Sequence, residues 1–360
     1  MKLTPEKILR ESIPPLTELF KIIGSKRAKS IEYEDRTKEI RLEKLSKILG
    51  FECKHCLKIE LETFINNPKI LEKIKKTKIF DWRILPNKKN FYKKRARQKT
   101  VKEALLWIKK QNITSKNYGP LHIFPYHKIA YSGIIVITKN QIVGEIISGD
   151  LWQLIYGTQN HKPTYFIYNF KKWYFSQNIP LIEKKRVMRI AQRLQANSIS
   201  KRNLLKKSHI KFNQKKYIEG YFEFRIYTNN KFILNDYDRE IKKVFTYTQI
   251  PKEKSIYLSG TSASPGVAIG KKRTIKDPSK DSINKNDILV CPLMTLKHLP
   301  FLRKAAGVIT KNGNCLSHMS IIARELKKPY IICPEIEKSK IKNGVTIKLN
   351  ANNGLIKVSL

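Results

Sequence analysis

One histidine stands in a segment whose residue types and spacing suit phosphoryl chemistry. The apolar run 307–310 is followed by a polar loop that contains Gly313 and Asn314, and the loop ends at Ser317 and His318. Serine is a preferred N-cap residue, so the pattern predicts that a helix begins here with the histidine in its first turn. A polar loop with an exposed histidine remains the alternative interpretation.

The beginning of a helix would favour this chemistry for physical reasons. Its unpaired N–H groups and partial positive charge attract a phosphate, and they lower the pKa of a nearby imidazole, which keeps the nucleophile neutral. We expect the hydroxyls of Thr310 and Ser317 to add donors. Gly313 allows a positive φ and a close backbone approach, and Asn314 is among the few other residues that tolerate a positive φ.

The same residues resemble a known signature. They read Thr310-x-x-Gly313-Asn314-x-x-Ser317-His318-x-x-Ile321-x-Ala323-Arg324. This order is similar to that of the swivelling phosphohistidine (mobile) domain of PEP-utilising enzymes, which include phosphoenolpyruvate synthase, pyruvate phosphate dikinase and rifampin phosphotransferase. The family usually has a second glycine where this chain has Asn314. Further matching segments are 260–270, 287–290, 325–329 and 343–347.

The resemblance extends over about residues 258–360. It implies that His318 takes up a phosphoryl group and passes it on. It also implies catalytic or structural roles in the same loop and helix for Thr310, Gly313, Ser317 and Arg324, the last as a phosphate-pairing or structural cation.

The chain before this domain must then contain the site from which the histidine is phosphorylated. Residues 1–118 are basic and read as mostly helical, with a capping box that begins a helix at Thr100. Residues 119–250 contain two predicted hairpins, 129–148 and 221–234, and a helical stretch at 183–206. A polar segment with a proline, 251–257, is the expected linker. After it, six short apolar runs and two helical stretches, 297–305 and 318–327, predict a compact α/β domain.

Residues 119–250 resemble a divergent second lobe of an ATP-grasp domain, and residues 1–118 are a possible reduced first lobe. On this resemblance, Glu223 and Asn235 are candidate Mg²⁺ ligands on neighbouring strands, and Glu145 is a candidate nucleotide-binding residue. The family has arginine and proline where this chain has Tyr237 and Asp238. Arg239 and Arg83 are the candidate phosphate-binding cations that remain.

Composition adds a second possibility. The formal net charge is +44, and residues 69–116 hold 17 Lys or Arg against three acidic residues. Such a surface attracts nucleotide phosphates, nucleic acid or an acidic protein partner, although a merely solvated basic surface fits equally well. The chain shows neither a signal peptide nor an apolar run long enough to span a membrane, so we expect a cytoplasmic location.

The sequence thus predicts an α/β (α+β) protein, with a divergent ATP-grasp-like region followed by a compact β/β/α swivelling phosphohistidine domain. The expected activity is a phosphotransferase that uses Mg²⁺ and ATP and moves a phosphoryl group from the nucleotide through His318 to a small-molecule acceptor. The alternative is a catalytically degenerate carrier or scaffold subunit whose basic region binds a protein partner or nucleic acid.

Overall fold

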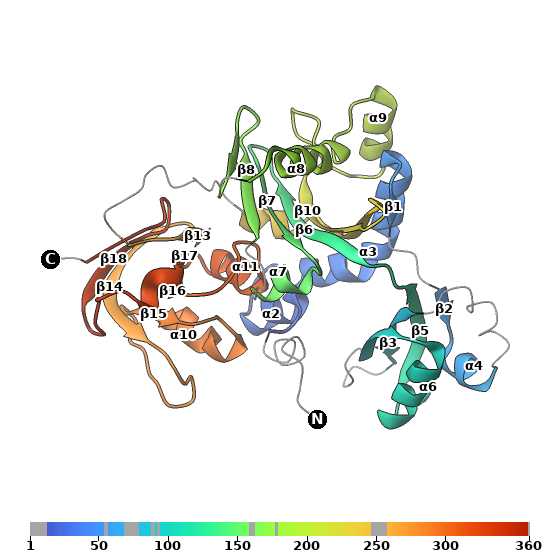
Figure 1. Cartoon of the computed structure of the whole chain (residues 1–360), viewed down its shortest axis with the longest axis horizontal. Helices are drawn as coiled ribbons and strands as arrows, with labels where there is room; N and C mark the ends of the chain where they lie inside the picture. Colours follow the sequence, from blue (N-terminus) through green and yellow to red (C-terminus); the bar gives the residue numbers. More distant parts are fainter. Residues whose placement is uncertain are drawn as a thin grey trace. The chain divides into compact units, whose positions relative to one another are not determined.

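The computed structural model describes residues 13–53, 57–67, 79–87, 91, 94–157, 163–176, 179–245 and 258–358 (Figure 1). Helices and sheets are mixed along the chain, which confirms the expected α/β class. One compact unit comprises residues 1–52, 129–226 and 232–360, and a second comprises residues 53–128 and 227–231. The predicted linker, 251–257, lies outside the described residues.

An eight-stranded sheet forms the C-terminal domain. Its strand order is β12-β19-β18-β14-β15-β16-β17-β13. The strands are β12 (Leu258–Ser259), β13 (Thr261–Ser264), β14 (Val267–Thr274), β15 (Ile288–Cys291), β16 (Gly307–Thr310), β17 (Tyr330–Ile332), β18 (Thr346–Asn350) and β19 (Leu355–Val358). All six predicted apolar runs are strands here. Five of them place β-branched side chains in the buried layer, whereas β14 buries Ala268 and exposes Val267 and Ile269.

The centre of this sheet positions the histidine segment. Strands β14, β15, β16 and β17 pair in parallel. Helix α11 (His318–Glu325) connects β16 to β17, and the 3-10 helix η2 (Leu296–His298) with helix α10 (Leu299–Lys304) connects β15 to β16. Parallel strands need such helical crossovers. The loop before α11 therefore begins at the carboxyl end of a buried strand.

A seven-stranded antiparallel sheet forms the other part of the first unit. Its order is β1-β11-β10-β6-β7-β8-β9. The strands are β1 (Glu52–Cys53), β6 (Ile129–Ile137), β7 (Ile142–Ser148), β8 (Thr164–Tyr168), β9 (Trp173–Phe175), β10 (Gly220–Tyr227) and β11 (Phe232–Asp238). Both predicted hairpins, β6–β7 and β10–β11, are confirmed with antiparallel pairing.

In the described chain, the helices of this part pack on the sheet or on one another. They are α2 (Leu16–Ile22), α3 (Ala28–Leu49), α7 (Trp152–Tyr156), α8 (Leu181–Arg193) and α9 (Ile199–Lys207), and the 3-10 helix η1 (Ile241–Val244) follows β11. The expected single helix at 183–206 is two helices, because the chain turns after α8 and Ser198 caps a new helix. In Figure 1, α11 lies beside α2 and α7, which it contacts. One hydrophobic core includes residues of all three helices.

The second unit contains a four-stranded antiparallel sheet, ordered β2-β5-β3-β4. Its elements are β2 (Leu57–Ile59), α4 (Leu61–Asn66), β3 (Phe80–Pro86), β4 (Lys94–Lys99), α6 (Val101–Lys110) and β5 (Tyr118–Pro125). The capping box at Thr100 is confirmed. The strands were not expected in a mostly helical region, and the predicted boundary at residue 118 falls at the start of β5. Among the described residues, no helix is long and apolar enough to cross a membrane.

Candidate active site

His318 is the first residue of helix α11, as the sequence predicted, and Ser317 is its N-cap. The imidazole is only 8% exposed. Its Nδ1 atom lies 3.1 Å from the backbone carbonyl oxygen of Pro14, which precedes helix α2. A carbonyl oxygen can only accept, so Nδ1 carries the hydrogen and the lone pair of the neutral ring is on Nε2. The ring of Tyr156 approaches edge-on at a centroid distance of 6.4 Å.

The protonation state also suits a nucleophile. Burial lowers the pKa of His318 to about 4, although the contact with the Pro14 carbonyl raises it. The imidazole is therefore neutral at physiological pH. The sequence predicted a lowered pKa from the helix N-terminus, whereas the structure gives burial under the N-terminal segment as the main cause.

The loop before the histidine packs closely on helix α7. Gly313 has a φ of +149°, and its Cα atom lies 3.0 Å from the position that a Cβ atom on Gly157 would occupy. Asn314 is not among the residues with positive φ, contrary to the expectation. Instead its side chain is buried, and Nδ2 donates to the carbonyl oxygens of Gln153 (2.9 Å) and Leu154 (3.3 Å). Asparagine stands here because its amide satisfies carbonyl groups of α7.

The two hydroxyl groups predicted to face a phosphate have partners within the domain. Thr310 Oγ1 lies 2.8 Å from the hydroxyl of Tyr330. Ser317 Oγ lies 3.0 Å from Ser320 Oγ and accepts from the Ser320 amide. These contacts fix the beginning of α11, and both side chains are buried. Their predicted role as phosphate donors stays a prediction.

Glu145 is placed differently from what the sequence suggested. This residue of β7 is 2% exposed, and its carboxylate accepts hydrogen bonds from the amides of Cys315 (2.7 Å) and Leu316 (3.0 Å). The pKa of Glu145 is raised to about 7 by burial, which the two amide contacts partly offset. The carboxylate thus binds the histidine loop directly, a contact that no local sequence pattern indicates.

Arg324 lies on the same helix as His318, but its guanidinium is placed over the ring of Phe245, at 4.6 Å from the centroid. Burial lowers the pKa of Arg324, whereas the nearby Tyr165, Cys315 and Glu145 raise it. Of the two predicted roles, these contacts favour the structural one.

Glu223 and Asn235 lie on adjacent strands, as predicted. Glu223 is paired with Asp236, and Phe224 with Leu234, so Asn235 is the extra residue of a β-bulge. Within the described residues, the Asn235 Oδ1 atom is buried and has no hydrogen-bond partner. Burial and Asp236 raise the pKa of Glu223 to about 7.

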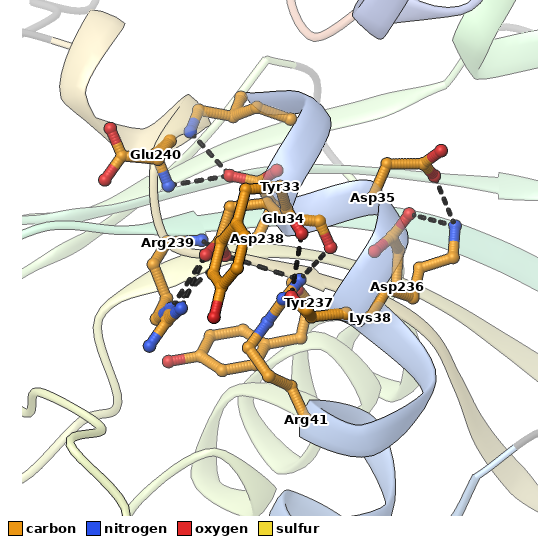
Figure 2. Close-up of polar contacts among 12 residues, drawn as sticks. Tyr33, Glu34, Asp35, Lys38, Arg41, Asp236, Tyr237, Asp238, Arg239 and Glu240 are labelled. Carbon is orange, nitrogen blue, oxygen red and sulfur yellow. Dashed lines mark hydrogen bonds and ion pairs between the residues drawn. The ribbon is translucent and has the colours of Figure 1, made fainter. Parts of the chain in front are cut away.

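A lysine from helix α3 completes this acidic cluster. Lys38 Nζ lies 2.8 Å from Asp236 Oδ2 and 3.6 Å from Asp35 Oδ1 (Figure 2). The pKa of Lys38 is lowered by burial but raised more strongly by the carboxylates of Asp236 and Asp35. Neither Lys38 nor Asp236 was identified from the sequence, because α3 and β11 are separated by almost 200 residues. Among the described residues, no three His, Cys, Asp or Glu side chains are arranged to hold a metal.

Arg239 was a candidate phosphate ligand, but its guanidinium is paired with a buried carboxylate. Arg239 Nη2 lies 2.6 Å from Glu34 Oε1, and Nε lies 3.1 Å from the same oxygen. Arg41 Nη2 lies 3.3 Å from Glu34 Oε2 and donates to the carbonyl oxygen of Tyr237 (Figure 2). Two arginines thus neutralise one glutamate, which gives Arg239 a structural partner.

The two departures from the family pattern next to Arg239 also have structural partners. The ring of Tyr237 stacks on Phe222 at a centroid distance of 4.9 Å. Asp238 Oδ1 accepts from the amides of Glu240 and Ile241, both at 2.7 Å, and so caps the 3-10 helix. The residues that replace arginine and proline therefore stabilise β11 and the turn that follows it.

Arg83 lies on β3 in the second unit. In the strand register it stands opposite Arg95 of β4 and His122 of β5. Its Nε atom is buried and has no hydrogen-bond partner in the described part of the chain. The neighbouring Trp82 and Ile84 face the core of this unit, so Arg83 points to the opposite face of the sheet. Much of the basic segment 69–116, including 69–78, lies outside the described residues.

Comparison with known proteins concerns mainly the C-terminal domain. Residues 283–354 match the family model described as PEP-utilising enzyme, mobile domain. Phosphoenolpyruvate synthase from Pyrococcus furiosus is 31% identical over 106 residues, which is 29% of this chain and 13% of that protein. The prodigiosin synthesizing transferase PigC from Serratia marcescens is 34% identical over 101 residues, 28% of this chain and 11% of its own length. The chain therefore matches only about an eighth of these relatives.

Among solved structures, a RiPP-associated ATP-grasp ligase from Chryseobacterium gregarium, in complex with ADP and a leader and core peptide, aligns with 55% of this chain and 50% of its own. The sequence identity is 12% and the TM-score is 0.28.

Proposed function

Since the C-terminal domain is a mobile domain of the PEP-utilising enzyme family, we propose that the chain is a phosphotransferase that carries a phosphoryl group on Nε2 of His318. The observation that carries the proposal is the contact between Nδ1 and the Pro14 carbonyl. It directs the free lone pair to Nε2, while burial of the ring keeps it neutral by lowering its pKa. In the transfer, an Nε2–phosphorus bond forms as the bond from phosphorus to its leaving oxygen breaks.

The donor in this proposal is Mg-ATP. The oxygen-rich cluster at the β10–β11 bulge fits a Mg²⁺ ion, because Mg²⁺ prefers oxygen ligands and the buried Asn235 Oδ1 atom has no hydrogen-bond partner among the described residues. Glu223, Asn235 and Asp236 would hold the ion, and it would neutralise charge on the phosphates. Burial and the neighbouring Asp236 raise the pKa of Glu223 to about 7, and a bound cation would favour its ionised form, as Lys38 already does.

The acceptor is proposed to be a small molecule that takes the group from the phosphohistidine. A covalent carrier divides one transfer into two, so each half can have its own geometry. Arg83 remains a separate proposal, as an anion-binding residue of the second unit. Nucleic acid or a protein partner at the basic region 69–116 is likewise a proposal that depends on charge alone.

Labelling tests this function. The full chain is incubated with Mg²⁺ and ATP labelled in the β or γ position, and acid-labile, base-stable label is measured. We expect label in the wild type and in the control His127→Ala, a loss in His318→Ala, and at least a tenfold slower uptake in Glu223→Gln. Label from PEP but not from ATP would overturn the nucleotide donor. Absence of label from both would overturn the carrier function.

A further inference from the structure

We propose that Glu145 is a positioning residue that holds the histidine loop in its docked place and thereby controls the exposure of His318. This inference deepens the proposed function and rests on it for its catalytic meaning, although the contact itself stands on the geometry. Glu145 lies on a strand of the seven-stranded sheet, whereas the loop belongs to the eight-stranded sheet of the C-terminal domain.

The direction of the Glu145 side chain follows from the strand. Side chains alternate along β7, so Glu145 shares a face with Val143 and Ile147. Both of those residues belong to the hydrophobic core that also includes Cys315 and Leu316 of the loop. A carboxylate therefore stands in a largely apolar contact between the sheet and the loop, with the buried guanidinium of Arg324 as the nearby cation.

Such a carboxylate is unfavourable unless the loop is present. Burial of an unpaired charge is costly, and the two short contacts with the Cys315 and Leu316 amides provide charge-assisted compensation. An apolar residue would suit the same position of β7 better if packing were its only role. The burial of Glu145 is thus conditional on the loop, as expected for a docking contact that forms and breaks.

The surroundings of Glu145 agree with an interface that opens. The hydroxyl of Tyr165, on the neighbouring strand and in register with Glu145, is buried without a hydrogen-bond partner in the described part of the chain. An unsatisfied buried hydroxyl destabilises the docked state. That cost disappears when the loop leaves and water hydrates the hydroxyl. The free-energy difference between the docked and the undocked loop is thereby reduced.

Two further contacts hold the loop, but they carry no net charge. Asn314 donates to the carbonyl groups of α7, and Gly313 packs on Gly157. With the loop docked, His318 is 8% exposed, which leaves little room for a separate acceptor. For the loop to carry His318 away from this place, the amides of Cys315 and Leu316 must leave the Glu145 carboxylate.

Amide hydrogen exchange tests the contact directly. In the full chain, Glu145→Ala is expected to raise exchange at Cys315 and Leu316 at least tenfold. Glu145→Gln should have a smaller effect, because its carbonyl oxygen still accepts from one amide. The control is Glu183→Gln, since Glu183 pairs with Arg186 and Tyr131 and is remote in sequence from the loop. Unchanged exchange at the two amides, or equal loss of protection in β10 and β11, would overturn the proposal.

The reactivity of His318 toward diethyl pyrocarbonate provides the second readout. This reagent modifies exposed neutral imidazole, so Glu145→Ala should accelerate modification of His318 at least tenfold, while Glu183→Gln leaves it unchanged. A rate in Glu145→Ala equal to that of the wild type would count against the proposal. Both readouts are independent of any phosphoryl donor. If the chain takes up no label from ATP or PEP, the proposed function fails and the exchange result still decides the role of Glu145.

Discussion

The Nδ1 atom of His318 lies 3.1 Å from the carbonyl oxygen of Pro14, a residue 304 positions earlier in the chain. This contact fixes the tautomer of the imidazole, because the carbonyl oxygen accepts and cannot donate. It also places a segment before helix α2 over the histidine. One long-range contact therefore determines which ring nitrogen is nucleophilic and contributes to the burial that keeps the ring neutral.

The first prediction concerns the site of phosphorylation. A phosphoryl group on His318 is expected on Nε2 and not on Nδ1, since Nδ1 is hydrogen-bonded to Pro14. Two-dimensional ¹H–¹⁵N correlation of the phosphorylated, ¹⁵N-labelled chain distinguishes the two isomers. Detection of the Nδ1 isomer alone would show that the ring reacts in another orientation.

The second prediction concerns Asn314. Asn314→Asp replaces a donor by a carboxylate that faces the carbonyl oxygens of Gln153 and Leu154. Loss of the donor at a buried position costs about 1–3 kcal/mol, and the charge adds to this. The free energy of unfolding measured with urea should fall accordingly.

Two further variants serve as controls in this experiment. One loses the hydrogen bonds without an added charge, and the other makes the same Asn-to-Asp change at an exposed position. Asn314→Gly, which restores the residue usual in the family, should lose the hydrogen bonds without introducing a charge, and is expected to be less destabilising than Asn314→Asp. Asn352→Asp provides a control at an exposed turn. Equal stability of Asn314→Asp and the wild type would show that the loop does not depend on this contact.

The third prediction concerns pH. The pKa of Glu145 is raised to about 7 in the docked state from an ordinary value of 4.5, so its contribution to stability is present below 4.5 and lost as the pH rises through 7. The pKa of His318 is lowered to about 4 from 6.5. The contribution of His318 is present above 6.5 and lost as the pH falls through 4. Between about pH 4.5 and 6.5 the two contributions oppose each other.

Single variants separate these opposing contributions. His318→Gln removes the His318 contribution and keeps that of Glu145. Its free energy of unfolding should therefore decrease relative to the wild type as the pH rises from 4.5 to 6.5. Glu145→Gln should give the opposite slope. Each slope is at most about 1.4 kcal/mol per pH unit, the value for one proton. Tyr165 and Cys315, which face Glu145, have pKa values raised well above their ordinary range and stay neutral in this window. Parallel curves for all three proteins would contradict the assignment.

Local sequence patterns are sufficient to predict the main local features of the C-terminal domain. The strand at 307–310, the N-cap at Ser317 and the helix that begins at His318 follow from residues within a few positions of one another, as do both hairpins of the first unit. Their patterns depend on backbone preference and on side-chain periodicity, which neighbouring residues largely decide. The strands of the second unit were not predicted: β4 is mostly basic, although β3 alternates buried and partly exposed residues in the pattern typical of a strand.

The partners of these residues, in contrast, depend on long-range packing. Glu145 and the loop amides are 170 and 171 positions apart, and Glu34 and Arg239 are 205 apart. The family resemblance suggested Glu145 and Arg239 as nucleotide-binding candidates, and in the fold one binds the histidine loop and the other pairs with a buried glutamate. A charged side chain takes the partner that packing brings within hydrogen-bond distance, and packing depends on the whole chain rather than on the residues nearby.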